Sequence, residues 1–328
     1  MRGLTTQEFQ LFENLAALTQ KELHGTMTNF LKLLYSDVTE TDQYICAKGD
    51  IPIALVAHMD TVFSVPATDI YYDPRKNVLW SPEGLGADDR AGIFAIISIL
   101  QRTKLRPHII LTTDEERGCI GANALARVAC PFKDLKYLVQ LDRRGANDCV
   151  FYDCYNPEFI SYVESFGFVE NYGTFSDISA LCPVWKVCGV NLSIGYYDEH
   201  SISETLHIGQ MFETIDKVTN MLKEADTAEY FTYTRKARSH FDYLTKTYAG
   251  TKGQVICPSC QGTFSEYDTF PVKGLDGETK HYCVDCIAAA NIEWCECCQE
   301  PYEVDPMDTY GLKMCPDCLL EALKNESY

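Results

Sequence analysis

Hydrophobic and polar positions along the first 225 residues repeat with the periods of both strands and helices. Five short apolar runs, each bounded by polar or glycine-containing turns, predict strands at residues 51–58, 108–115, 135–142, 148–155 and 190–200. Residues 88–100 are apolar on most sides and predict a buried helix, whereas 206–225 repeats apolar residues every three to four positions and predicts an amphipathic one. This alternation favours an α/β fold, which we expect to be a three-layer sandwich around a mixed, mostly parallel sheet.

The pattern changes after residue 225. Residues 226–254 are polar, aromatic and locally basic, and the remainder of the chain is rich in cysteine. We therefore expect a large domain over 1–225, a connecting helix or linker over 226–254, and a small module over 255–328.

Composition and charge narrow the class of protein. The chain of 328 residues is 46% hydrophobic and 23% charged, which is typical of a globular protein. It contains no apolar run of about 18 residues, so we expect no membrane span. Its start lacks the apolar centre of a signal peptide, which favours a cytoplasmic location. The formal charge of −19 disfavours nucleic acid and anionic membranes as partners.

Side chains that bind metal ions stand at the ends of several predicted strands. They are His58, Asp60, Glu115, Glu116, Asp142 and His200, and Asp88 joins them at the start of a predicted helix. In open α/β sheets, ligands bind beyond the carboxyl ends of the strands, so these side chains are expected to converge. Each also has an ordinary interpretation, such as a helix cap for Asp88. Taken together, they predict a metal centre.

Several motifs in the same region are specific in combination. They are HMDTV (58–62), GADDRAG (86–92), TDEERGCIGA (113–122), LD (141–142), GTFSDISAL (173–181) and EHSISETL (199–206). Over residues 50–210 the chain resembles the co-catalytic zinc exopeptidases, which include leucyl and glutamyl aminopeptidases, tripeptidase T and related carboxypeptidases.

This resemblance implies a role for each candidate residue. His58 and Asp142 would hold one metal, Glu116 and His200 the other, Asp88 would bridge the two, Glu115 would be the general base, and Asp60 would orient His58. Zinc is the expected metal, although imidazole and carboxylate ligands also suit cobalt or manganese. Two such ions would lower the pKa of a shared water, whose proton Glu115 would take and pass to the leaving amine.

The spacing of these residues narrows the expected activity. Asp142 and His200 are 58 positions apart, which leaves no room for an inserted domain and favours the compact aminopeptidase type. Arg144 follows Asp142 closely and could bind a substrate carboxylate, or it could form a surface ion pair. A deacylase or carboxypeptidase acting on N-acyl amino acids therefore stays open. So does a non-catalytic interaction protein with a vestigial site.

The C-terminal segment contains four Cys-x-x-Cys pairs. They are Cys257 and Cys260, Cys283 and Cys286, Cys295 and Cys298, and Cys315 and Cys318. Eight thiolates suffice for two structural zinc ions, most simply with consecutive pairs sharing a site, although a cross-braced pairing stays open. The segment resembles tandem zinc ribbons or a LIM-like pair. From residue 255 it has 14 acidic and 4 basic residues, which favours a protein partner over nucleic acid.

Overall fold

The computed structural model describes residues 2–225, 227–235, 254–265, 269–274, 278–287, 292–295 and 301–304. The chain forms two compact units, Met1–Lys236 and Ala237–Tyr328. Each unit is described by itself below. Within the described residues, no helix is both long enough and apolar enough to cross a membrane.

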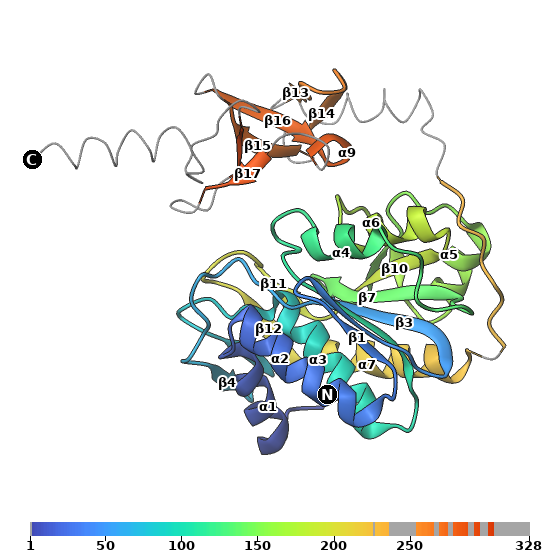
Figure 1. Ribbon diagram of the computed structural model, residues 1–328. Helices are drawn as coiled ribbons and strands as arrows, with labels where there is room; N and C mark the ends of the chain where they lie inside the picture. Colours follow the sequence, from blue (N-terminus) through green and yellow to red (C-terminus); the bar gives the residue numbers. More distant parts are fainter. Residues whose placement is uncertain are drawn as a thin grey trace, which may run out of the picture. The chain divides into compact units, whose positions relative to one another are not determined.

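An eight-stranded mixed sheet forms the centre of the first unit (Figure 1). Its strands, in spatial order, are β1 (Val38–Glu40), β2 (Tyr44–Ala47), β6 (Pro107–Thr112), β3 (Ile51–His58), β7 (Tyr137–Arg143), β10 (Cys188–Ser193), β8 (Asp148–Val150) and β9 (Val169–Glu170). The four central strands β6, β3, β7 and β10 are parallel, whereas β2 and β8 run antiparallel to their inner neighbours. All side chains of β6 and most of those of β3 and β7 are buried, as expected when both faces of a parallel sheet are covered.

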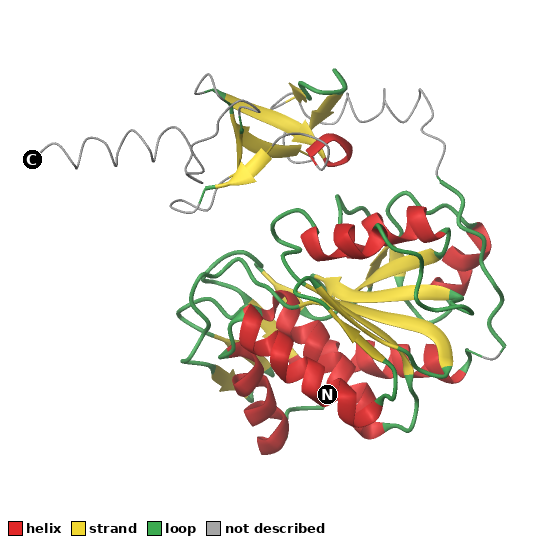
Figure 2. Ribbon diagram, in the orientation of Figure 1, coloured by secondary structure: helices red, strands yellow, loops and turns green. Residues whose placement is uncertain are grey.

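Helices cover both faces of this sheet (Figure 2). One face carries α1 (Thr6–Ala16), α2 (Gln20–Leu34), α3 (Ala87–Arg102) and α7 (Ile208–Lys223), and the other carries α4 (Ile120–Ala126), α5 (Pro157–Glu164) and α6 (Asp177–Trp185). The predicted α/β sandwich is thereby confirmed. Every residue of α3 from Ala87 to Leu100 is buried, in agreement with its apolar sequence.

Two predicted strands are shorter than expected. The strand expected over 148–155 ends at Val150, and the one expected over 190–200 ends at Ser193 and is followed by a turn at Gly195. Gly195 has a φ of 97°, and a Cβ there would lie 2.8 Å from the carbonyl oxygen of His207. The turn separates β10 from the short strand β11 (Tyr196–Tyr197), which belongs to another sheet.

That second sheet has four antiparallel strands. They are, in spatial order, β11, β12 (Thr205–His207), β5 (Val78–Trp80) and β4 (Tyr71–Asp73). Its side chains alternate between two environments, as the pleat of a strand requires. Leu79 and Leu206 are fully buried against the core, whereas Trp80 is 42% exposed on the opposite face.

Residues 227–235, which we call the strap, belong to the first unit and run extended along it. No helix is present in this described part of 226–254, and residues 236–253 lie outside the described residues. The strap forms isolated bridges from Thr232 to Val187 and from Arg235 to Cys154, and the carbonyl of Thr234 accepts the N–H of Tyr155 at 2.7 Å. Phe231 and Tyr233 are buried. The strap is therefore part of the core of this unit and differs from the linker helix that was expected.

Replacing Phe231 by alanine is expected to destabilise the first unit by about 3 kcal/mol, because it removes a buried aromatic side chain. The ring of Phe231 is 8% exposed and lies 5.0–6.1 Å, between ring centroids, from those of Tyr137, Phe159 and Tyr162. Chemical denaturation would measure the change. Tyr230→Ala is the matched control, because Tyr230 is 66% exposed, and its cost should stay within about 1 kcal/mol. If both changes lower the free energy of unfolding by the same amount, burial of the Phe231 ring does not stabilise the first unit.

His108 is buried in β6, and we expect it to make the free energy of unfolding depend on pH. Burial, followed by the charge of Lys48, lowers the pKa of His108 from 6.5 to about 4, and its neutral Nδ1 accepts the N–H of Gly49 at 3.0 Å. The unfolded chain binds this proton first as the pH falls, so stability is lost between about pH 6.5 and 4. The loss between pH 7 and 5 is expected to be about 2 kcal/mol. His108→Gln should remove this part of the pH dependence in parallel denaturation curves, and an unchanged difference between the two pH values would contradict it.

The described residues of the second unit form two small sheets. One pairs β13 (Gln254–Ile256) with β14 (Thr263–Ser265), and the other has the order β16 (Thr279–Cys283), β15 (Thr269–Lys273), β18 (Pro301–Glu303) and β17 (Ile292–Trp294), with α9 (Val284–Ile287) after β16. Glu303 accepts hydrogen bonds from Lys280 at 2.7 Å and from Tyr282 at 2.5 Å. The four-stranded sheet of this unit joins β15 and β16 with β17 and β18, so it contains strands from both halves of the cysteine-rich segment.

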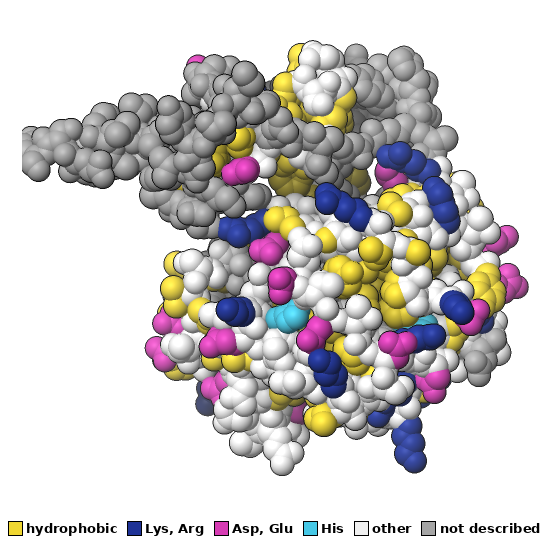
Figure 3. Space-filling model, in the orientation of Figure 1, with side chains coloured by type: hydrophobic (Ala, Val, Ile, Leu, Met, Phe, Trp, Pro, Cys, Tyr) yellow, Lys and Arg dark blue, Asp and Glu magenta, His cyan; other side chains and the backbone are white. Residues whose placement is uncertain are grey.

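Charges on the first unit are mixed in sign. Figure 3 shows Lys and Arg side chains interspersed with Asp and Glu over its visible face. The acidic side chains of the first unit are therefore not gathered in one patch on this face.

Candidate metal centre

Three neighbouring parallel strands bring candidate ligands to one edge of the main sheet. His58 is the last residue of β3, Asp142 lies near the end of β7, and Glu115 and Glu116 follow β6 in a turn. Because β6, β3 and β7 are adjacent and parallel, their carboxyl ends meet. Side chains that are up to 84 positions apart in sequence therefore lie close together.

Asp88 enters the same region at the beginning of α3. The backbone N–H groups of Gly86 and Asp88 donate to the two carboxylate oxygens of Glu204, at 2.6 and 3.0 Å. Gly86 has a φ of 65°, which favours glycine, and it starts the helix without a side-chain cap. Glu204 thus accepts hydrogen bonds from N–H groups that have no partner within the first turn of α3, and it holds Asp88 in place.

The Asp88 carboxylate lies between the two histidines. Its Oδ1 is 3.0 Å from Nε2 of His58, and its Oδ2 is 3.3 Å from Nε2 of His200. Each histidine also faces a carboxylate of its own. Asp142 Oδ1 is 3.6 Å from His58 Nε2, and Glu116 Oε1 is 3.0 Å from His200 Nε2. Three groups of three residues here have ligand atoms within 4.8 Å of one another. Two of them share Asp88, which joins His58 and Asp142 in one and Glu116 and His200 in the other, and the third consists of His58, Glu115 and Glu116.

Asp60 connects the two sides of this arrangement. Its Oδ1 is 3.2 Å from Nδ1 of His58 and accepts the N–H of Glu115 at 3.0 Å, while its Oδ2 accepts the N–H of Glu116 at 3.0 Å. One carboxylate therefore fixes both the ring of His58 and the turn that carries the two glutamates.

Burial of so many acids has a large electrostatic cost. Burial raises the pKa of Asp142 to about 6 and that of Glu116 to about 7, and it raises the pKa of Glu115 as well. Hydrogen bonds that the protonated His200 donates to the carboxylates of Asp88 and Glu116 raise its pKa to about 11. For Asp88 burial acts in the same direction as for the other acids, but the two histidines outweigh it and lower its pKa. Carboxylates and imidazoles crowded in this way fit divalent cations, which would offset the negative charge.

Comparisons with known proteins agree with this geometry. Residues 43–164 match the sequence model of peptidase family M28, and this segment includes His58, Asp88, Glu116 and Asp142. The first unit contains a metallopeptidase domain.

Solved structures also resemble the metallopeptidase domain. Aminopeptidase PepT from Bacillus cereus is 15% identical with a TM-score of 0.53, and a tripeptidase from Staphylococcus aureus is 13% identical with a TM-score of 0.54. Both alignments cover 67% of this chain and 98% of the other. At these identities the likeness shows the fold. No curated protein matches the sequence.

The metallopeptidase domain places further polar residues around the ligands, and the sequence analysis missed them. Gln140 Nε2 donates to Asp142 Oδ2 at 3.0 Å, and the hydroxyl of Tyr196 donates to Asp142 Oδ1 at 3.1 Å. Asp177 is fully buried, accepts a hydrogen bond from Thr112, and has one oxygen with no partner among the described residues. Two of them left a signal in the sequence: Gln140 precedes Asp142 by two positions and shares its face of the strand, and Asp177 lies within the motif GTFSDISAL.

The candidate Arg144 and the nearby histidine His207 occupy different surroundings. Arg144 is 64% exposed and donates to Glu199 Oε1 at 3.1 Å, so the ion pair that was considered for it is present. Its binding of a substrate carboxylate stays a prediction. His207 precedes α7, packs edge-on against Tyr197, and lies outside the groups of metal-competent side chains found among the described residues.

A second cluster of metal-competent residues lies in the cysteine-rich unit. The sulfur atoms of Cys257, Cys260, Cys283 and Cys286 lie within 4.8 Å of one another. Of the second set of four, Cys295 is buried. Its predicted partners Cys298, Cys315 and Cys318 lie outside the described residues.

Proposed function

We propose that the first unit is a metal-dependent aminopeptidase with two metal sites. The observation that carries this proposal is the Asp88 carboxylate between His58 and His200, because each histidine has a further carboxylate and Asp88 alone is common to both groups. His58 and Asp142 would hold one cation, Glu116 and His200 the other, and Asp88 would bridge them. Zinc, cobalt and manganese all suit these ligands. When bound, the two cations supply Lewis-acid activation of the peptide carbonyl and of water.

The residues of the chain would position and transfer protons. Glu115 lies beside the ligands, and burial raises its pKa, which suits a group that accepts and returns a proton near neutral pH. We assign it the role of general base towards water and general acid towards the leaving amine. The hydrogen bond from its N–H to Asp60 would keep its backbone fixed during the reaction.

An aminopeptidase is supported over related amide hydrolases by two observations. The two solved structures described above are an aminopeptidase and a tripeptidase. Residues 143–199 are all described, and they supply strands and helices of the first unit without an inserted domain. The exposed guanidinium of Arg144 favours the second candidate, a deacylase of N-acyl amino acids whose carboxylate it would bind.

A substrate panel separates these candidates. Aminoacyl anilides and short peptides with a free amine should be hydrolysed in the presence of zinc, cobalt or manganese, and their N-acetylated counterparts should not. Hydrolysis of N-acetyl amino acids alone would establish the deacylase. No turnover of any substrate with any of the three metals would point to a vestigial site.

We also propose that the second unit holds structural zinc. Cys257, Cys260, Cys283 and Cys286 would bind one ion as a four-thiolate site, and the other four cysteines a second. Its acidic sequence favours contact with a protein partner. Cys46, Cys119, Cys149 and Cys182 are buried thiols outside any disulfide, which fits a reducing compartment such as the cytoplasm.

Elemental analysis of the purified chain is expected to find about four metal ions per molecule, two of which chelators remove more readily. Cys283→Ser should remove one of the tightly held ions. Cys130→Ser is the control, since Cys130 lies outside both clusters, and it should leave the count unchanged. If Cys283→Ser retains the full count, the four-thiolate assignment is wrong.

A further inference from the structure

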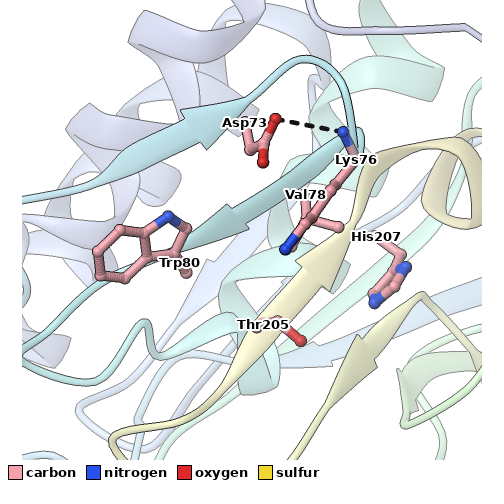
Figure 4. A pocket seen from close by; sticks show the side chains of 6 residues that line it. All are labelled: Asp73, Lys76, Val78, Trp80, Thr205 and His207. Atoms are coloured by element: carbon pink, nitrogen blue, oxygen red, sulfur yellow. Dashed lines mark hydrogen bonds between the residues drawn. The ribbon is translucent and has the colours of Figure 1, made fainter.

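The small four-stranded sheet carries a pocket on its outer face, which we call the outer pocket. Its volume is about 600 Å³, and it is lined by Asp73, Lys76, Val78, Trp80, Thr205 and His207 (Figure 4). The register of the strands explains why these lining residues lie together. Trp80 pairs with Thr205, and Val78 pairs with both Asp73 and His207, so these side chains share one face.

The outer pocket and the metal centre are on opposite faces of this sheet. Glu204 directly precedes Thr205, and its carboxylate faces the N–H groups of Gly86 and Asp88 beside the metal centre. Neighbouring side chains of an extended chain point in opposite directions, so Thr205 faces the outer pocket. A molecule bound in the outer pocket is therefore not a substrate in position for hydrolysis.

The outer pocket offers one positive and one negative group. Asp73 Oδ1 accepts the N–H groups of Arg75 and Lys76, at 2.9 and 3.2 Å, which leaves Oδ2 available to a ligand. No ion pair within 4.0 Å is found for either the Asp73 carboxylate or the Lys76 ammonium among the described residues. In Figure 4 the side chain of Lys76 extends along the outer pocket, with its amino group on the side of Trp80 and Thr205.

The remaining walls are apolar and aromatic. Trp80 is 42% exposed, and its ring stacks on that of Tyr71 at 4.9 Å between centroids, which fixes the orientation of the indole. Val78 lies two positions before it on the same face. Burial lowers the pKa of His207, so its imidazole is neutral at pH 7 and adds a planar polar wall.

We propose that the outer pocket binds a free α-amino acid with an apolar or aromatic side chain. The α-carboxylate pairs with Lys76 and accepts a hydrogen bond from the Thr205 hydroxyl, the α-ammonium pairs with Asp73, and the side chain packs on Trp80 and Val78. A volume of about 600 Å³ lies in the range of small-molecule sites. Such an amino acid is the product class of the proposed aminopeptidase. That link rests on the proposed function, whereas the binding itself does not.

Calorimetric titration of the metal-loaded protein with L-phenylalanine tests this site. Lys76→Met and Asp73→Asn should each weaken binding about tenfold or more, because each removes one charge-assisted contact. Lys104→Met is the matched control, because Lys104 is exposed and lies outside the outer pocket, and it should bind as the unchanged protein does. Unchanged thermal melting of the three variants shows that they fold.

Two analogues test whether binding requires both the ammonium and the carboxylate of the amino acid. 3-Phenylpropionate lacks the ammonium and phenethylamine lacks the carboxylate, so each should bind about tenfold or more weakly than L-phenylalanine. The proposal is overturned if saturable binding is absent up to about 10 mM, if either analogue binds as well as the amino acid, or if Lys76→Met leaves the affinity unchanged. The substrate panel for hydrolysis is independent of these titrations, so the two proposals can fail separately.

Discussion

Replacing Glu115 by glutamine is expected to lower kcat/KM for a free-amine substrate by about 10²–10⁴-fold, the range that general acid–base groups contribute. Glutamine keeps the size and most of the polarity of the side chain but cannot take a proton. The N–H bonds of Glu115 and Glu116 to Asp60 involve only the backbone and remain available. The metal content should therefore stay at the level of the unchanged protein.

The neighbouring acid provides the control for Glu115. Asp114 lies in the same turn, but its N–H donates to Gln20 Oε1 at 2.9 Å and its carboxylate lies 3.7 Å from Arg117. Its φ of 53° is tolerated by asparagine. Asp114→Asn should change activity by only a few-fold. The assignment of Glu115 fails if Glu115→Gln retains near-normal turnover with the metals in place.

Replacing Asp88 by alanine is expected to remove both catalytic metals. Asp88 is shared by the group of His58 and Asp142 and the group of Glu116 and His200, and its oxygens lie 3.0 and 3.3 Å from the two histidines. Without it each site keeps two ligands, and the two ions would face each other without a bridging charge. The total metal count should fall from about four to about two per chain, with loss of activity by about 10³-fold or more.

His207→Ala provides the comparison for Asp88→Ala. His207 is the histidine nearest in sequence to His200, yet it belongs to none of the metal-competent groups in the described part of the chain. Its replacement should leave the metal count at about four. Retention of all metals by Asp88→Ala, measured by elemental analysis after dialysis, would refute a bridging role.

The candidate centre could be predicted because its residues stand at strand ends. Each apolar run ends where the strand meets the edge of the sheet, so His58, Glu115 and Asp142 mark the same edge in the sequence and in the structure. Asp177 and Tyr196 could not be found in this way. They reach the centre from α6 and from the small sheet, through packing that no local pattern encodes.

The strap was expected to belong to a connecting helix or linker, because its aromatic and basic residues are compatible with either. A different period was present in the same residues. Phe231 and Tyr233 are buried while Tyr230 and Thr232 alternate with them, which is the period of a strand. Phe231 packs against the rings of Tyr137 and Phe159, which come from distant parts of the chain, and no local pattern in the strap identifies these partners.

The strap also determines how early during synthesis the first unit can complete its folded core. Residues 227–235 complete the packing of the first unit, and they are made after every predicted ligand of its metal centre, including His200. Domains tend to fold as units while the chain emerges from the ribosome. The metallopeptidase domain therefore cannot close its core until the chain has been extended well beyond residue 235, by which time the first cysteine pair, at residues 257 and 260, is already being added. The cysteine-rich segment is therefore still being synthesised when the first unit can complete its core, since its last predicted ligand is Cys318.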